Sequence, residues 1–190
     1  YRYNTGWQDT YMKVTATFSG DVEPIPVSGD IAIDEANFPD EVFREYVKGN
    51  FDADGDDVLS ASEIAAATYI GVNNMGISSL QGVEYFTALT YLNCGENKLT
   101  VLDLSHNTAL TYLYCGRNQL TELNVSHNTA LIELDCFENQ LTELDVSHNT
   151  ALTSLYCQYQ SLDVAAPNTT SRADYPYSFN LRALNTSLEI

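Results

Sequence analysis

A 21-residue segment occurs three times in succession, without insertions, in the middle of this chain. The copies run from Leu89 to Ala109, from Leu110 to Ala130 and from Leu131 to Ala151. A unit of this length cannot bury its own apolar face, so it has to stack on its neighbours. The repeat therefore predicts a solenoid, and it favours an extended binding surface over a single catalytic pocket.

Every copy carries apolar residues at the same six positions. In the first copy these are Leu89, Leu92, Cys94, Leu99, Leu102 and Leu104. Around Leu92, the flanking Tyr91 and Asn93 complete the two-residue period of a half-buried strand. Each coil should therefore contribute one short strand and an extended return, with the strands of successive coils parallel and about 4.8 Å apart.

An asparagine follows each cysteine of the repeats by three positions, at Asn97, Asn118 and Asn139. In a buried turn, a backbone polar group without a partner costs roughly 1–3 kcal/mol. An inward-facing amide offers both donors and an acceptor. We expect one asparagine per coil to bond the backbone of its own coil and of the next.

The register continues beyond the three copies in both directions. A fourth unit follows with Leu152, Leu155, Cys157 and Leu162, although Gln160 replaces its asparagine. A degenerate first coil precedes them with Ile70, Val72, Ile77 and Leu80, at a 22-residue offset that exceeds the regular period by one. The array should therefore contain about five coils, of which the outer two are atypical.

The four cysteines occupy one position of successive coils, at Cys94, Cys115, Cys136 and Cys157. Four cysteines can indicate two disulfides, but parallel side chains suit disulfide torsions poorly. Four sulfur atoms in a line also fit a tetrahedral zinc site poorly. The favoured interpretation is a ladder of buried thiols that pack as small apolar groups.

The pattern LxxLxCxxNxL resembles bacterial leucine-rich repeats, specifically the 21-residue class of internalin-like proteins, in which cysteine can replace a core leucine. The resemblance implies an α/β-type repeat solenoid with parallel strands on its concave face. It also implies a secreted or cell-surface bacterial protein.

An acidic stretch from Asp52 to Glu63 precedes the repeats and resembles an EF-hand calcium loop. Its ligands would be Asp52, Asp54, Asp56, the Val58 carbonyl, Ser60 and Glu63. Calcium takes six to eight oxygen ligands, and this spacing supplies them from one loop.

Asp57 stands where glycine usually provides a left-handed backbone, at a cost of about 1 kcal/mol. The alternative is an acidic turn that stays empty. EF-hand loops normally pair, and the sequence contains one.

Helices are expected on both sides of this loop. Pro39 suits a first helical turn, and the apolar face after it consists of Val42, Phe43, Tyr46 and Val47. Ser60 and Glu63 also read as the capping box of a helix through Ala67. The stretch resembles the N-terminal caps of secreted bacterial repeat proteins. That resemblance implies that it covers the apolar end of the solenoid, with calcium as a structural ion.

These features divide the chain into four regions. They are an N-terminal β segment or linker (1–30), a helical cap with the EF-hand-like loop (31–69), the leucine-rich repeats (70–166) and a C-terminal cap or the start of a following region (167–190). The first region is based on the alternating residues from Met12 to Phe18. We expect the chain to be a mature or excised segment.

The formal net charge of −18 argues against nucleic acid or anionic lipid as the main partner. No stretch approaches the ~20 apolar residues that span a bilayer, so direct membrane insertion is not expected.

Candidate ligand-binding residues are those that vary between copies and face outward from the predicted strands. They are Tyr91, Asn93, Tyr112, Tyr114, Glu133, Asp135, Phe137, Tyr156 and Tyr159. Aromatic rings are frequent anchors of binding energy, and the neighbouring acids suit a protein with a basic spot or a glycan that stacks on rings. Exposed tyrosines on strands also arise from strand preference alone.

The recurring serines and histidines predict turns rather than catalysis. His106, His127 and His148 each lie in an SHNT segment, where Ser, Asn and Thr stabilise a tight turn. A metal-binding histidine ladder is the less favoured interpretation, and a catalytic triad would not recur in every coil. We therefore expect no enzyme, but a non-catalytic module for adhesion or interaction. The alternative is a rigid spacer within a larger surface protein.

Overall fold

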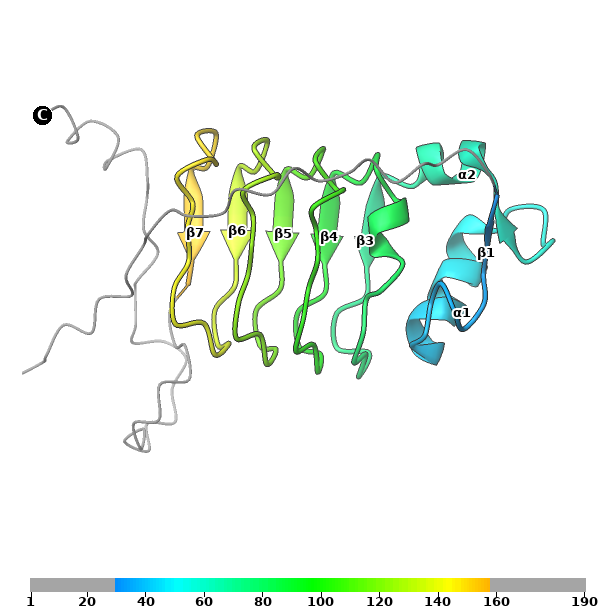
Figure 1. Ribbon diagram of the computed structural model, residues 1–190, viewed down its shortest axis with the longest axis horizontal. Coiled ribbons are helices and arrows are strands. Elements are labelled where there is room, and N and C mark those ends of the chain that lie inside the picture. Colours follow the sequence, from blue (N-terminus) through cyan, green and yellow to red (C-terminus); the bar gives the residue numbers. More distant parts are fainter. Residues whose placement is uncertain (1–29, 158–190) are drawn as a thin grey trace, which may run out of the picture.

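The computed structural model describes residues 30–157, and its main element is a row of parallel strands. They are β3 (Tyr69–Gly71), β4 (Tyr91–Asn93), β5 (Tyr112–Tyr114), β6 (Glu133–Asp135) and β7 (Ser154–Tyr156), in that order across one five-stranded sheet (Figure 1). The elements before them are β1 (Ile31–Ala32), α1 (Glu41–Phe51), β2 (Val58–Leu59) and α2 (Ala61–Ala66), and the short 3₁₀ helix η1 (Val83–Tyr85) lies between β3 and β4. The predicted solenoid is confirmed.

The strand register follows the repeat. Leu92 pairs with Leu113, and Leu113 pairs with Leu134, so each pair joins equivalent positions of successive copies. Ile70 pairs with Leu92, so the longer offset of the first coil is confirmed. The central residue of each of these strands is buried. The two residues beside it face outward, on the side predicted to be concave, and we call that surface the sheet face.

Three of the four cysteines of the predicted ladder are buried. Cys94, Cys115 and Cys136 have no exposed surface, Cys157 is partly exposed, and none of these four residues forms a disulfide. Burial raises the pKa of the Cys94 thiol to about 12 and those of Cys115 and Cys136 well above their usual value. These thiols therefore stay protonated and pack as apolar groups.

The predicted asparagine ladder is present, with one correction. The Asn118 amide donates to the carbonyls of Cys94 and Cys115, at 3.0 Å each, and its Oδ1 accepts the Leu99 amide at 3.0 Å. Asn139 repeats the pattern one coil later. The second coil bonded by each asparagine is therefore the preceding one and not the next, because the side chain points back toward the first coil.

A second asparagine ladder was not predicted. Asn107, Asn128 and Asn149 lie in the SHNT turns and are at most 3% exposed. The amide of Asn128 donates to the carbonyls of Leu104 and Asn107 at 3.0 and 2.9 Å. Asn149 bonds the next pair in the same way. The two ladders thus fasten both ends of each coil to the coil before it.

Helix α1 starts later than the sequence suggested. Asp40 is its N-cap, and its Oδ1 accepts the amides of Val42 and Phe43, so Pro39 lies before the helix and not in its first turn. Phe43 and Val47, four residues apart, form the buried stripe, whereas Val42 lies beside this stripe and is 41% exposed. The prediction that Val42 belongs to the apolar face is wrong.

Helix α1 packs on the first coil. The other carboxylate oxygen of Asp40 accepts the backbone amide and hydroxyl of Ser78 at 2.8 and 2.9 Å, and the Gly71 amide donates to the Tyr46 hydroxyl. The rings of Phe51 and Phe86 lie 5.0 Å apart. Figure 1 shows both helices at the β3 end of the row of strands.

Within residues 30–157, neither helix has the length and apolar character needed to cross a bilayer.

Replacing Asn118 by alanine should lower the free energy of unfolding by roughly 2–4 kcal/mol, because one amide and two carbonyls lose their partner. Asn124→Ala is the matched control, since Asn124 is exposed and accepts the Ser126 amide. Its loss should stay below about 1 kcal/mol. Urea unfolding followed by circular dichroism measures both, and equal losses would contradict a structural role for the buried ladder.

Candidate functional site

The acidic loop between α1 and α2 folds around Asp52. One oxygen of this carboxylate accepts the amides of Gly55 and Asp56 at 2.9 and 3.1 Å, and the other accepts the Asp57 amide at 3.1 Å. Asp57 has a φ of 64°, which is the left-handed conformation expected where it replaces glycine. Its carboxylate forms an ion pair with Lys48.

Glu63 closes the loop. Its Oε1 accepts the Ala53 amide at 2.6 Å, and its Oε2 accepts the Ser60 amide and hydroxyl at 2.8 Å each. These bonds, led by the Ser60 amide, hold the pKa of Glu63 below its usual value. Ser60 in turn caps α2, so the predicted capping box is present, and the helix ends at Ala66 instead of Ala67.

Three of the six predicted ligands converge. The carboxylates of Asp52, Asp54 and Glu63 place oxygen atoms within 4.8 Å of one another. Repulsion from Asp56 raises the pKa of Asp54. The remaining ligands make local bonds: Asp56 accepts the Val58 amide at 2.9 Å, and Ser60 donates to Glu63.

The loop takes its strand partner from the chain that precedes it. In the antiparallel pair of β1 and β2, Ile31 lies opposite Leu59 and Ala32 opposite Val58. The Ile33 amide also donates to the Asp57 carbonyl at 2.9 Å. A single loop of this kind therefore has a partner without a second EF-hand.

The sheet face carries two columns of side chains. The strand register aligns Tyr69, Tyr91, Tyr112, Glu133 and Ser154 in the first column and Gly71, Asn93, Tyr114, Asp135 and Tyr156 in the second. From β3 to β5 the exposed side chains of these columns are mainly tyrosines, and at β6 both are acidic. Of the predicted binding residues, Tyr159 lies outside the described residues.

The tyrosines of this face touch one another and form what we call the tyrosine ladder: Tyr69, Tyr91, Tyr112 and Tyr114. The rings of Tyr69 and Tyr91 are stacked at 4.7 Å, and Tyr91 lies 6.2 Å from Tyr112 and 5.5 Å from Tyr114. Tyr69 is 57% exposed. Sequence reasoning missed it, although the offset that aligns Ile70 with Leu92 also aligns Tyr69 with Tyr91 and was the available signal.

Two neighbouring side chains of the sheet face, on β5 and β6, have raised pKa values. Burial raises the pKa of Asp135 to about 6, against the stabilising bond from the Phe137 amide to its Oδ1. Burial also raises the pKa of Tyr114, and its hydrogen bond with Glu133 raises it further. The phenol therefore remains a hydrogen-bond donor.

Phe137 does not project freely, as an exposed anchor would. A Cβ at Gly116 would come within 2.4 Å of its ring, so the ring lies directly against that glycine. The Arg117 guanidinium lies 5.3 Å from the ring centroid and joins Glu96 and Glu138 at 3.1 and 2.9 Å. Phe137 thus serves as a wall beside the strands.

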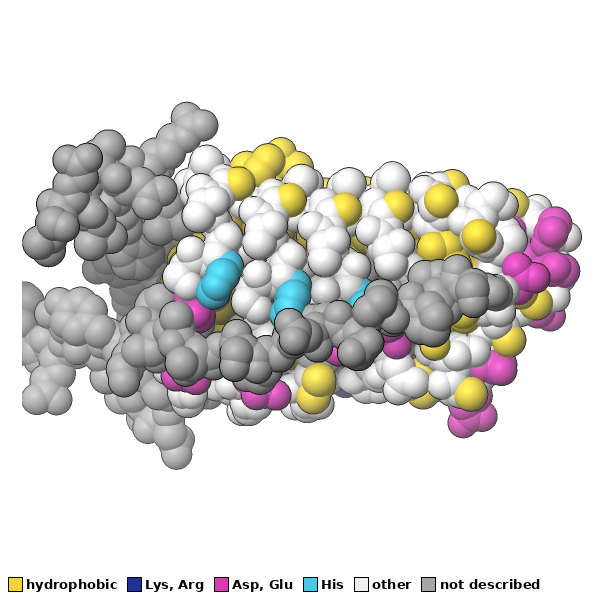
Figure 2. Space-filling view, turned by 45° about the horizontal axis from the view of Figure 1, so that its top comes forward, with side chains coloured by type: hydrophobic (Ala, Val, Ile, Leu, Met, Phe, Trp, Pro, Cys, Tyr) yellow, Lys and Arg dark blue, Asp and Glu magenta, His cyan; other side chains and the backbone are white. Residues whose placement is uncertain are grey.

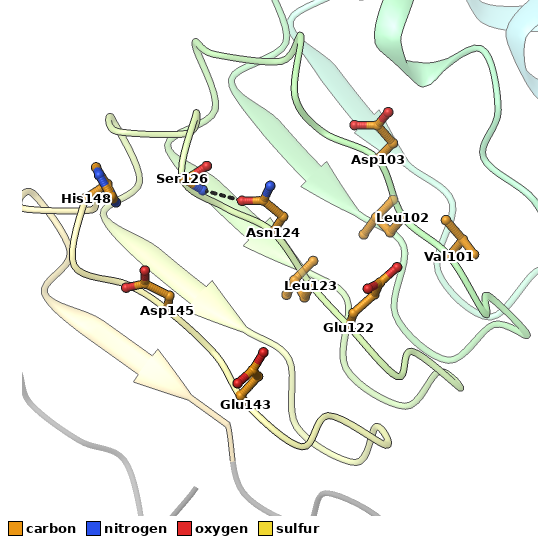
Figure 3. A pocket seen from close by; sticks show the side chains of 10 residues that line it. All are labelled: Val101, Leu102, Asp103, Glu122, Leu123, Asn124, Ser126, Glu143, Asp145 and His148. Atoms are coloured by element: carbon orange, nitrogen blue, oxygen red, sulfur yellow. Dashed lines mark hydrogen bonds between the residues drawn. The ribbon is translucent and has the colours of Figure 1, made fainter. Parts of the chain in front are cut away.

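The described surface is hollowed both on the sheet face and on the return segments. One hollow, of about 160 Å³, lies on the sheet face and is lined by Asn73, Asn93, Gly95, Glu96, Tyr114, Gly116, Asp135 and Phe137. The other, of about 410 Å³, lies on the return segments, where carboxylates from three coils surround apolar groups such as Val101 (Figure 3). In Figure 3 these carboxylates are spread along the coils and do not point to one centre.

The histidines lie in a row across the repeats (Figure 2). The Nδ1 atoms of His106, His127 and His148 lie 3.1, 3.3 and 3.2 Å from the hydroxyl of the serine directly before each. The same contact recurs in each turn, as expected for a local turn interaction.

No model of a known protein family matches the chain. It is similar to internalin J of Listeria monocytogenes, with 39% identity over 70 residues, which are 37% of this chain and 8% of that protein. Two solved structures from the same species also resemble it. The functional domain of InlJ, which includes a cysteine ladder, has 35% identity and a TM-score of 0.58, covering 68% of this chain and 33% of that one. The internalin InlF has 30% identity and a TM-score of 0.63, covering 72% and 41%.

The repeats are therefore homologous to the leucine-rich repeats of internalins J and F, as the sequence pattern predicted. The chain spans less than half the length of each of these relatives.

Replacing Asp135 by asparagine should raise the thermal midpoint at neutral pH, because it removes a charge that burial disfavours. The ionised carboxylate weakens the fold above about pH 6, and this effect fades as the pH falls toward the ordinary value of 3.8. The increase in thermal midpoint should therefore disappear as the pH falls from about 6 to 3.8.

Asp145→Asn is the contrasting variant. The Ser147 amide bonds Asp145 at 2.8 Å and lowers its pKa, so its charged form stabilises the fold above the ordinary value of 3.8 and this stability is lost below. This variant should lower the midpoint at neutral pH. Thermal melts across this pH range measure both, and shifts of the same sign would contradict the assignment.

Proposed function

We propose that this chain is a non-catalytic interaction module of a secreted or cell-surface bacterial protein, and that its sheet face recognises a protein or glycan. The observation that carries the proposal is the tyrosine ladder, which places aromatic rings next to the carboxylates of β6. The homology to internalin repeats supports a surface role.

The physical argument concerns the contribution of an exposed aromatic row. Tyrosine combines a large apolar area with a polar tip and few rotatable bonds, so it binds at low entropic cost. Stacking of Tyr69 on Tyr91 limits their motion further. An ordered row of rings therefore presents a preformed contact area.

The alternative is a rigid spacer whose parent protein acts elsewhere. Its support is the unbroken strand register from β3 to β7. The two functions differ in their dependence on the exposed tyrosines. A binding surface needs these side chains, whereas a spacer does not.

Replacing Tyr91 and Tyr112 together by alanine should weaken ligand binding at least about tenfold. The ligand would first be found by screening the chain against protein and glycan arrays. Val101→Ala is the matched control, since Val101 is 64% exposed but lies on a return segment. Unchanged affinity in the tyrosine variant would reject the sheet face as the binding surface, and an equal loss in the control would do the same.

We also infer that the acidic loop holds calcium as a structural ion. The donors are all oxygen atoms, as calcium prefers, and three carboxylates converge where they repel each other without a cation. Asp52, Asp54 and Glu63 would hold the ion, assisted by Asp56, the Val58 carbonyl and Ser60. The ion would offset this repulsion and tie α1 to α2.

Calcium at about 100-fold over its dissociation constant should raise the thermal midpoint by about 5–10 °C relative to chelator. Asp54→Asn should abolish the increase. Asp57→Asn is the matched control, because asparagine also tolerates the left-handed backbone of this position and Asp57 lies outside the converging group. The Asp57→Asn variant should keep the calcium-dependent increase in thermal midpoint. An unchanged thermal midpoint of the unmodified chain in millimolar calcium would contradict the proposed calcium site.

A further inference from the structure

We propose that the small hollow on the sheet face binds one arginine or lysine side chain of a protein partner. This inference rests on the proposed function, because it takes the sheet face as the binding surface. It adds the chemistry of one contact and favours a protein over a glycan.

The hollow exists because of the residue directly after the cysteine in successive coils. This position is Gly95 in the first copy, Gly116 in the second and Phe137 in the third. Both glycines are buried, and a Cβ at Gly116 would meet the Phe137 ring at 2.4 Å and an oxygen of Asp135 at 3.0 Å. The two glycines therefore line the floor of the hollow, and the phenylalanine, whose ring lies against Gly116, closes one side.

The charge of the hollow is negative and incompletely balanced. Asp135 and Glu96 both line it. Arg117 lies 3.1 Å from Glu96 and 2.9 Å from Glu138. Within the described part of the chain, no arginine or lysine lies at ion-pair distance from Asp135. A partner's cation would supply the missing charge.

The walls suit a cation as well. Tyr114 and Phe137 line the hollow, and aromatic faces attract guanidinium and ammonium groups within about 6 Å. The Phe137 ring already has the Arg117 guanidinium at 5.3 Å. Aromatic walls with a carboxylate select a positively charged side chain over a neutral polar one.

The size fits the tip of one side chain. A volume of about 160 Å³ holds about five waters, which is well below the roughly 300–1,000 Å³ of pockets that enclose small molecules. A metal ion is a poorer occupant, because the hollow does not bring three candidate metal ligands together. Among residues 30–157, such a group occurs in the acidic loop.

The probe for this site is N-acetyl-arginine methylamide, with the uncharged citrulline analogue as its control. Titrated into the ¹⁵N-labelled chain, the arginine probe should shift the amide signals of Gly95, Gly116 and Phe137 with a millimolar dissociation constant. Asp135→Asn should weaken this binding at least tenfold. The matched control is Asp103→Asn, since Asp103 also accepts an amide two residues later but lines the hollow on the return segments.

Binding should weaken as the pH falls through about 6, where Asp135 takes up a proton. The other charged groups around it are Glu133, Glu138, Arg117 and Glu96. Asp135→Asn should therefore remove the step near 6.

Equal shifts with the citrulline probe, no saturable shift with arginine, or unchanged binding in Asp135→Asn would each overturn the inference. If these occur while the Tyr91 and Tyr112 variant still loses its ligand, the pocket fails and the proposed function stands. If arginine binds here but the tyrosine variant keeps full ligand affinity, the proposed function fails, and the hollow is then a cation site that does not serve binding of that ligand by the sheet face.

Discussion

The stacking of the coils depends on hydrogen bonds from buried asparagine side chains to the backbone of the preceding coil. The strands are only three residues long, so the sheet ladder alone satisfies few backbone groups. Asn118 and Asn139 serve the turn after each strand, and Asn128 and Asn149 serve the opposite turn. Fixed at both ends, a coil cannot slide relative to its neighbour without leaving several buried polar groups unpaired.

This fixed register determines what the surface can present. Residues at the same position of successive coils become neighbours, so a substitution in one copy changes one point in a column. Tyrosines in three coils give a row of rings in contact, and a switch to Glu133 and Asp135 in β6 makes its end acidic. The hollow arises in the same way, because two glycines precede a phenylalanine at one position. Variation between near-identical copies is therefore the source of the acidic end of the row and of the hollow.

The sequence was sufficient wherever periodicity carries the information. The offset of Ile70, the burial of Cys94, Cys115 and Cys136, and the bond of Asn118 within its own coil follow from spacing and from the need to satisfy backbone groups. The second asparagine ladder was missed because Asn128 lies in a polar turn, where a solvent-exposed role is the usual expectation. Only the three-dimensional path of the return segment brings that side chain inside.

The same limit applies to the sites. The candidate ligands of the acidic loop could be named from their spacing, and the capping box of Ser60 and Glu63 could be named from its motif. The covered ring of Phe137 and the raised pKa of Asp135 depend on packing between coils, which no local pattern encodes. Val42 and Pro39 were misplaced because the Asp40 cap, which also bonds Ser78 of the first coil, sets both the start and the rotation of α1.

Asp40 also explains how the acidic loop and the repeats are connected. Burial disfavours its charge, yet hydrogen bonds from Ser78 and Phe43 outweigh this and hold the pKa of Asp40 below its usual value. One carboxylate thus fixes the start of α1 and its contact with the first coil, while Asp52 follows directly after the end of the same helix. Phe51, next to Asp52, packs on Phe86 of the first coil. Any rearrangement of the loop would therefore move a helix that is anchored at both ends to the repeats, so the stability of the loop and that of the first coil should be coupled.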